Sequence, residues 1–161
     1  MAVKKEAAYH EASHAVVAHK SKFHSLVGDV NIEQYGAGEI FISLSKSKCT
    51  AAGKKAALET QKDKEVAKEL AVILCAGLIG EEIAAEKDSS LTPNEQCAVP
   101  DHELAVQQLK MAGLSSKYDF HQNSARDILN QEWETVERLA AYIFENHSAD
   151  PIKMAEIIDA A

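Results

Sequence analysis

Apolar residues recur with two different periods along the first part of the chain, and the change of period predicts a change of structure. Residues 4–19 are rich in alanine and contain neither glycine nor proline, which predicts a helix. Residues 26–32 and 40–44 carry β-branched and large apolar side chains on either side of a glycine-containing segment at 34–38. This arrangement predicts a β-hairpin, and because two strands alone are marginally stable, the ribbon must pack against helices.

The middle of the chain combines a polar segment with a strongly apolar one. Residues 45–62 are polar and rich in lysine, and we expect a surface loop there. Residues 63–87 have a helical pattern whose stretch from 70 to 79 is apolar on every side. A helix without a polar face belongs in the centre of a molecule. Gly77 and Gly80 lower its helix propensity and indicate the close approach of another backbone.

The last third of the chain predicts three more helices. After a loop at 88–99, Pro100 suits the first turn of a helix that runs to Met111. Residues 124–127 resemble a capping box that opens a long amphipathic helix ending near Asn146, and Asp150-Pro151 begins a short final helix. We therefore expect residues 1–161 to form a single domain that is mainly α with a small β ribbon (α+β).

Composition and charge narrow the class of protein. Of the 161 residues, 46% are apolar and 26% are charged, the balance of a soluble globular protein. The net charge of −8 argues against nucleic acid or an anionic membrane as a partner, because both favour clustered Lys and Arg. The longest apolar run, residues 70–80, is too short to span a bilayer. The cysteines at 49, 75 and 97 are an odd, scattered set, which predicts reduced thiols and a cytoplasmic location.

The sequence HEASH at residues 10–14 is an HExxH motif within a predicted helix. His10 and His14 are one helical turn apart on the same face, so both imidazoles can bind one zinc ion. Glu11 lies on a neighbouring side, where its carboxylate can reach a metal-bound water without binding the metal. Zinc lowers the pKa of such a water to about 7, and Glu11 is therefore the candidate general base of a peptidase.

A zinc site of this kind needs a third protein ligand, and spacing alone leaves several candidates. Glu81 and Glu82 lie near the end of the predicted buried helix, and Asp101 and His102 begin the next one. Paired acids near a helix end are usually solvated, and an aspartate at a helix start is usually a cap. The choice stays open on these grounds.

Four segments, in the same order, resemble the protease domain of the FtsH family of ATP-dependent zinc metalloproteases. AYHEASHAV at 8–16 resembles the family's zinc helix, A-Y-H-E-A-G-H-A. AGLIGEEI at 76–83 resembles its G-G-R-x-A-E-E-I helix, and PDHELAV at 100–106 stands where the family has N-D-(L/I)-x-x-A-T. ARDIL at 125–129 resembles its C-terminal A-x-x-I-L helix. The resemblance covers nearly the whole chain.

This resemblance implies a ligand set. The aspartate of the family's N-D step is the third zinc ligand and corresponds to Asp101, and Glu82 would then be structural or would orient a ligand imidazole. Two departures concern this region, because Ser13 replaces a glycine of the zinc helix and Pro100 replaces the asparagine. No phosphate-binding G-x-x-x-x-G-K-[ST] motif occurs, so we expect activity without ATP.

The expected function is that of a zinc metalloendopeptidase domain acting on peptides or unfolded protein segments. The alternative is a catalytically silent zinc-binding module that regulates or binds other proteins. A homo-oligomer or a separate ATPase partner is compatible with either function. His102 or His121 are candidates to stabilise an oxyanion. The strand predicted at 40–44 follows the zinc helix and could pair with a substrate peptide along its edge.

Overall fold

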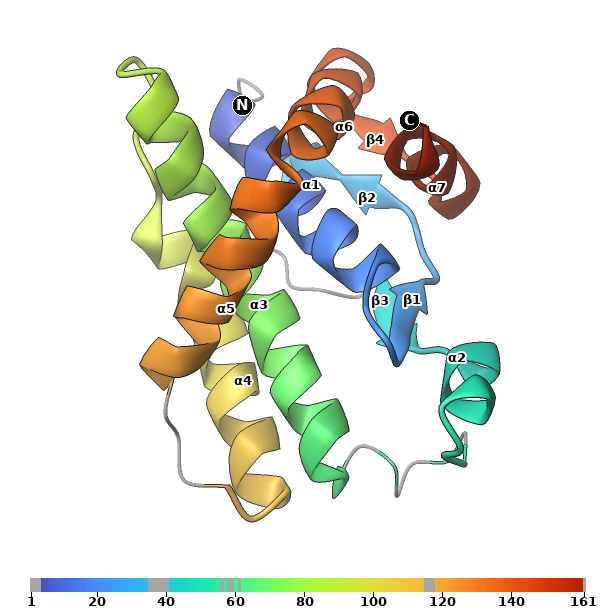
Figure 1. Ribbon diagram of the computed structural model, residues 1–161. Helices are drawn as coiled ribbons and strands as arrows, with labels where there is room; N and C mark the ends of the chain where they lie inside the picture. Colours follow the sequence, from blue (N-terminus) through green and yellow to red (C-terminus); the bar gives the residue numbers. More distant parts are fainter. Residues whose placement is uncertain are drawn as a thin grey trace.

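The computed structural model describes residues 4–34, 41–55, 57, 60, 62–114 and 118–160, and it is mainly helical (Figure 1). The helices are α1 (Lys5–His19), α2 (Lys46–Ala51), α3 (Lys64–Lys87), α4 (Val99–Met111), α5 (Tyr118–Gln131), α6 (Trp133–Asn146) and α7 (Pro151–Asp159). The strands are β1 (His24–Leu26), β2 (Val30–Asn31), β3 (Ile42–Leu44) and β4 (Ser148–Ala149), and the 3₁₀ helices are η1 (Ile32–Gln34) and η3 (Glu95–Ala98). The predicted fold class, mainly α with a small β ribbon, is confirmed.

Helix α1 lies at the centre and packs against α3 on one side and α6 on another (Figure 1). Most of its residues are buried, and many are alanines, which keep the helix narrow. Gly80 of α3 faces Ser13 of α1, and a Cβ atom at Gly80 would overlap the Ser13 side chain. The prediction that glycines of this segment mark a close backbone approach is confirmed, and the partner is the helix with the HExxH motif.

Helix α3 is the second central element, as its all-round apolar stretch predicts. The Asp63 side chain caps its first turn by accepting hydrogen bonds from the amides of Glu65 and Val66. Helices α1, α4 and α5 pack around it. None of the described helices is long and apolar enough to cross a membrane.

The β structure consists of two small antiparallel pairs. Strand β1 pairs with β3, with His24 opposite Leu44 and Leu26 opposite Ile42, so a small ribbon is present as predicted. The first strand expected at 26–32 is wrong, because this segment is divided between the end of β1 and β2. Strand β2 pairs instead with β4, which follows α6, and this long-range pairing is not predicted by the sequence pattern. Residues 35–38 of the predicted turn lie outside the described residues.

Two other predicted boundaries are wrong. The segment expected to be a loop at 45–62 contains α2, because the Ser45 hydroxyl accepts a hydrogen bond from the Lys48 amide and caps its first turn. The amphipathic helix expected from Ser124 to Asn146 is two helices, α5 and α6, which meet at the non-helical Glu132. Ser124 lies inside α5, where its hydroxyl donates to the Phe120 carbonyl instead of capping.

Candidate metal centre

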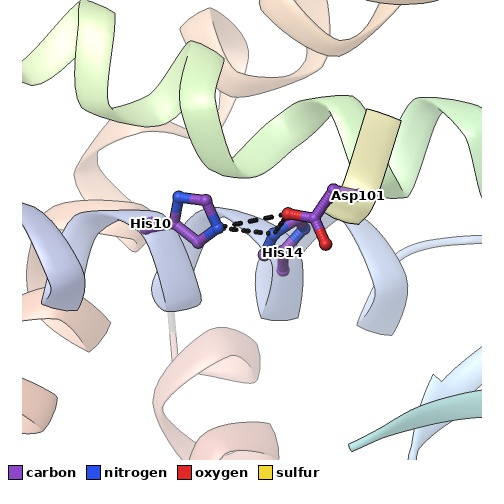
Figure 2. A group of neighbouring side chains, drawn as sticks. All are labelled: His10, His14 and Asp101. Atoms are coloured by element: carbon purple, nitrogen blue, oxygen red, sulfur yellow. Dashed lines mark hydrogen bonds and ion pairs between the residues drawn. The ribbon is translucent and has the colours of Figure 1, made fainter. Parts of the chain in front are cut away.

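Three side chains from two distant segments converge on one point of the core (Figure 2). His10 and His14 are one turn apart on α1, and Asp101 lies in the first turn of α4. The two Nε2 atoms are 3.1 Å apart, and Asp101 Oδ2 is 3.3 Å from His10 Nε2 and 3.2 Å from His14 Nε2. All three residues are nearly inaccessible, with exposures of 1%, 0% and 3%. The structure therefore brings together the three residues that the sequence nominated as ligands.

Groups of helix α3 orient both imidazole rings through hydrogen bonds at their Nδ1 atoms. His14 Nδ1 donates a hydrogen bond of 2.7 Å to the carbonyl oxygen of Ile73, which can only accept. His10 Nδ1 lies 2.7 Å from Glu81 Oε2, and an ionised carboxylate also only accepts. Each ring therefore carries its hydrogen on Nδ1. In the neutral rings both Nε2 lone pairs point toward each other and toward Asp101.

This arrangement of lone pairs fits a divalent cation. Three electron-rich atoms so close together repel one another unless a positive charge lies between them. Ligand atoms about 2.0–2.1 Å from a tetrahedral zinc ion lie roughly 3.3–3.4 Å apart. The observed separations of 3.1, 3.2 and 3.3 Å are close to that edge length. His, His and Asp are also ligand types that zinc accepts, so the residues present fit the metal.

Gly77 provides the room for the two rings. A Cβ atom built at this position would overlap Nε2 of both His10 and His14. Any other residue would therefore push the rings out of their converging geometry or force α1 away from α3. The glycine is required here by space.

The electrostatics of the cluster also favour a cation. Burial alone would lower the pKa of His10, but the hydrogen bonds to Asp101 and Glu81 outweigh it and raise this pKa to about 9. Burial would raise the pKa of Asp101, but its electrostatic interaction with His14 and its hydrogen bonds with both rings outweigh burial and lower this pKa. The carboxylates that hold a proton on His10 would equally hold a metal ion in its place.

Glu81 links helix α1 to the segment that precedes α4. Its Oε2 accepts from His10, and its Oε1 accepts a hydrogen bond of 3.1 Å from the amide of Asn94, in the segment that leads to α4. Glu81 thus orients the ring of His10, and Asp101 is the carboxylate whose oxygen lies near both Nε2 atoms. A signal for Glu81 exists in the sequence, because it lies four residues after Gly77 and eight after Ile73, on the same face of α3.

Glu82 does not orient an imidazole, contrary to one of the two roles expected for it. Its Oε2 accepts a hydrogen bond of 3.0 Å from Arg126 on α5, and Arg126 also reaches Glu86. Residues 81 and 82 are about 100° apart around a helix, so only one of them can face α1. Glu82 therefore has the structural role, and Glu81 has the orienting one.

The remaining predicted site residues surround the cluster less closely. Glu11 lies on α1 between the two histidines and is 8% exposed, the most accessible of the motif's three functional side chains. His102 follows Asp101 on α4 and is partly exposed, whereas His121 on α5 is buried. Burial lowers the pKa of both His102 and His121. Neither belongs to the converging group of ligand atoms, and their oxyanion role stays a prediction.

The sequence matches no protein-family model and no curated protein. The resemblance to the FtsH protease domain thus rests on the four sequence segments and on no comparison. The geometry of His10, His14 and Asp101 stands independently of it.

Proposed function

We propose that this chain is a zinc metalloendopeptidase of the HExxH type that hydrolyses peptides or unfolded protein segments without ATP. The observation that supports it is the buried triangle of His10 Nε2, His14 Nε2 and Asp101 Oδ2, with edges of 3.1–3.3 Å. The resemblance of the same residues to the FtsH zinc site points in the same direction. Folded substrates would require a separate ATPase partner.

The roles of the chain's own residues follow from their positions. His10, His14 and Asp101 would hold the ion, with His10 kept in the correct tautomer by Glu81. When bound, zinc supplies a lowered water pKa and polarisation of the scissile carbonyl. The Glu11 carboxylate would take the proton of the attacking water and deliver it to the amide nitrogen that leaves. Burial of the three ligands excludes bulk water and strengthens these electrostatic interactions.

The test is hydrolysis of unstructured casein and of a peptide library by the zinc-loaded protein. We expect Glu11→Gln to retain stoichiometric zinc and to lose turnover by about 100-fold or more, because general-base catalysis contributes roughly 10²–10⁴-fold. Glu82→Gln is the matched control, since this carboxylate is paired with Arg126. Turnover that is equal in wild type and Glu11→Gln would reject the proposal.

The burial of the cluster favours a second candidate, a catalytically silent zinc module with a regulatory or protein-binding role. Structural zinc sites are closed, whereas catalytic ones keep a position open to water, and the three ligand side chains here are at most 3% exposed. Under this alternative the protein would bind one zinc ion, lose stability on chelation and cleave no substrate. Elemental analysis that finds no bound metal, even after dialysis against zinc, would reject both candidates.

A further inference from the structure

A second buried histidine that pairs with a carboxylate lies outside the metal centre. His24 begins strand β1 and is 3% exposed, and its Nδ1 is 2.7 Å from Glu69 Oε1 on α3. Glu69 Oε1 also accepts from the amide of Phe23, and Oε2 accepts from that of Lys22. A carboxylate that receives several N–H groups is ionised and can only accept. His24 Nδ1 therefore carries a hydrogen, and Nε2 is the nitrogen available for another contact.

The His24 ring forms part of the wall of a small pocket. The pocket has a volume of about 200 Å³, below the roughly 300–1,000 Å³ of small-molecule sites and of a size for one side chain. Its walls are mostly apolar, and His24, Ser43 and Gln108 are the polar residues among them. The apolar lining residues are Ile42, Leu44, Val66, Ala67, Leu70 and Leu104.

The pocket lies close to the metal centre along two helices. Leu70 on α3 is three residues before Ile73, whose carbonyl accepts from His14. Leu104 on α4 is three residues after Asp101. Leu70 and Leu104 are therefore each about one helical turn, or roughly 5 Å along the helix axis, from Ile73 and Asp101 respectively.

The third wall is strand β3. Its residues Ile42, Ser43 and Leu44 all line the pocket, although successive side chains of a strand point to opposite faces. A pocket lined by three consecutive strand residues reaches the backbone of β3, while His24, the cross-strand partner of Leu44, forms its wall on the side of β1. Among the described residues β3 pairs with β1 alone, and its second edge is the side on which a peptide could pair as an added strand.

We propose that this pocket is a substrate subsite that selects tyrosine, with His24 Nε2 hydrogen-bonded to the phenol hydroxyl of a peptide lying along β3. The inference rests on the proposed function in taking an extended peptide as the ligand. Apolar walls fit an aromatic ring, and a hydroxyl both donates and accepts, so it matches Nε2 with or without a proton. A glutamate side chain fits less well, because its charge would be desolvated against aliphatic walls. Glu69 is a positioning residue that fixes the ring of His24.

The experiment compares three labelled, otherwise identical unstructured peptides with Tyr, Phe or Glu at a single position. Binding is measured by fluorescence anisotropy on zinc-loaded Glu11→Gln, and cleavage products of the wild type are mapped by mass spectrometry. We expect the Tyr peptide to bind about 3- to 10-fold more tightly than the Phe peptide, as one net hydrogen bond allows. In His24→Leu this ratio should fall to about 1, with the affinity for the Phe peptide changed less than about twofold.

The ratio separates recognition from stability, because a merely structural role of His24 would weaken both peptides equally. If His24→Leu folds poorly because Glu69 loses its histidine partner, the double variant His24→Leu/Glu69→Gln removes the carboxylate charge as well. His19→Leu is the matched control, since His19 forms a comparable pair with Asp159 at the protein surface. Equal binding of Tyr and Phe peptides, tighter binding of the Glu peptide, or no peptide binding would overturn the proposal.

The two proposals fail in different ways. Tyrosine selectivity that depends on His24, without Glu11-dependent cleavage, would uphold the subsite and reject the peptidase. Glu11-dependent cleavage with no preference for tyrosine would uphold the peptidase and reject the subsite.

Discussion

Among the described residues, two buried histidines, His10 and His24, each pair with a carboxylate in the same geometry but in different surroundings. His10 Nδ1 to Glu81 Oε2 and His24 Nδ1 to Glu69 Oε1 are both 2.7 Å, and both carboxylates come from α3. At His10 the opposite nitrogen meets a second imidazole and a carboxylate. At His24 the ring borders a pocket with mostly aliphatic walls.

The comparison shows that the pair itself fixes only the tautomer and direction of a ring. What the ring does depends on the groups that its Nε2 atom meets. Three converging lone pairs are stabilised by a positive charge, whereas an apolar pocket beside one polar group favours a neutral side chain that carries one polar group. The predictions below test this difference, beginning with the change of largest expected effect.

Asp101→Asn removes the anionic member of the first cluster at nearly constant volume. We expect zinc affinity to fall by more than roughly 100-fold, because loss of a ligand should exceed the 10–100-fold cost of losing an orienting partner. Competition with a chromogenic chelator at neutral pH measures the change. Glu82→Gln serves as the control and should stay within about twofold of the wild type. Zinc affinity that is unchanged in Asp101→Asn would contradict the assigned ligand set.

Glu81→Gln and Glu69→Gln are the same chemical change in the two pairs, so they test the comparison directly. We expect Glu81→Gln to weaken zinc binding by about 10- to 100-fold, since His10 loses the group that fixes its tautomer. Glu69→Gln should leave zinc affinity within about twofold and reduce the preference for the tyrosine peptide. Competition with the chromogenic chelator measures the zinc affinity of both variants. Equal losses of zinc affinity would show that the two pairs do not act separately.

Zinc binding should depend on pH through His10. Its pKa of about 9 in the metal-free protein means that the ring carries an extra proton at pH 7.5, whereas a metal-bound ring cannot. We therefore expect release of about one proton per zinc ion and an affinity that rises up to tenfold per pH unit until pH 9. Calorimetry in buffers of different ionisation enthalpy measures the released proton. An affinity that is independent of pH between 6.5 and 9 would contradict a protonated His10.

Ser13→Ala should have the smallest effect of these changes, and it should stabilise the fold. The Ser13 hydroxyl is buried between α1 and α3, and no hydrogen-bond partner for it occurs among the described residues. Removing an unsatisfied hydroxyl from a helix interior should raise the free energy of unfolding by about 1 kcal/mol. Chemical denaturation measures this change, and zinc affinity should stay constant. A destabilised variant would show that the hydroxyl has a partner such as a buried water.

Much of the centre could be predicted from the sequence, because it depends on local periodicity. The four-residue spacing of His10 and His14 and the placement of Gly77 and Gly80 follow from helix geometry alone. Asp101 follows only from the family resemblance, since nothing local distinguishes a ligand from a helix cap. The orienting role of Glu81 does not follow from the sequence, because it depends on the rotation of α3 against α1, which is a property of packing.

The β structure and the second pair show where sequence reasoning fails. Pairing of β2 with β4 joins segments more than a hundred residues apart, and two-residue strands carry no usable pattern. His24 follows no motif, and its partner Glu69 precedes the apolar stretch of α3, where nothing in the sequence distinguishes it from the neighbouring charged residues. Only the folded chain brings them together.

The position of Asp101 has a consequence for the mechanics of the molecule. Helix α4 packs mainly against α3, while the other two nominated ligands are on α1. A cation bound there would act as a cross-link that fastens α4 to the central helix across 87 residues of chain. Chelation should then accelerate amide hydrogen exchange in α4 before it loosens α1, and the metal would set how long α4 stays docked.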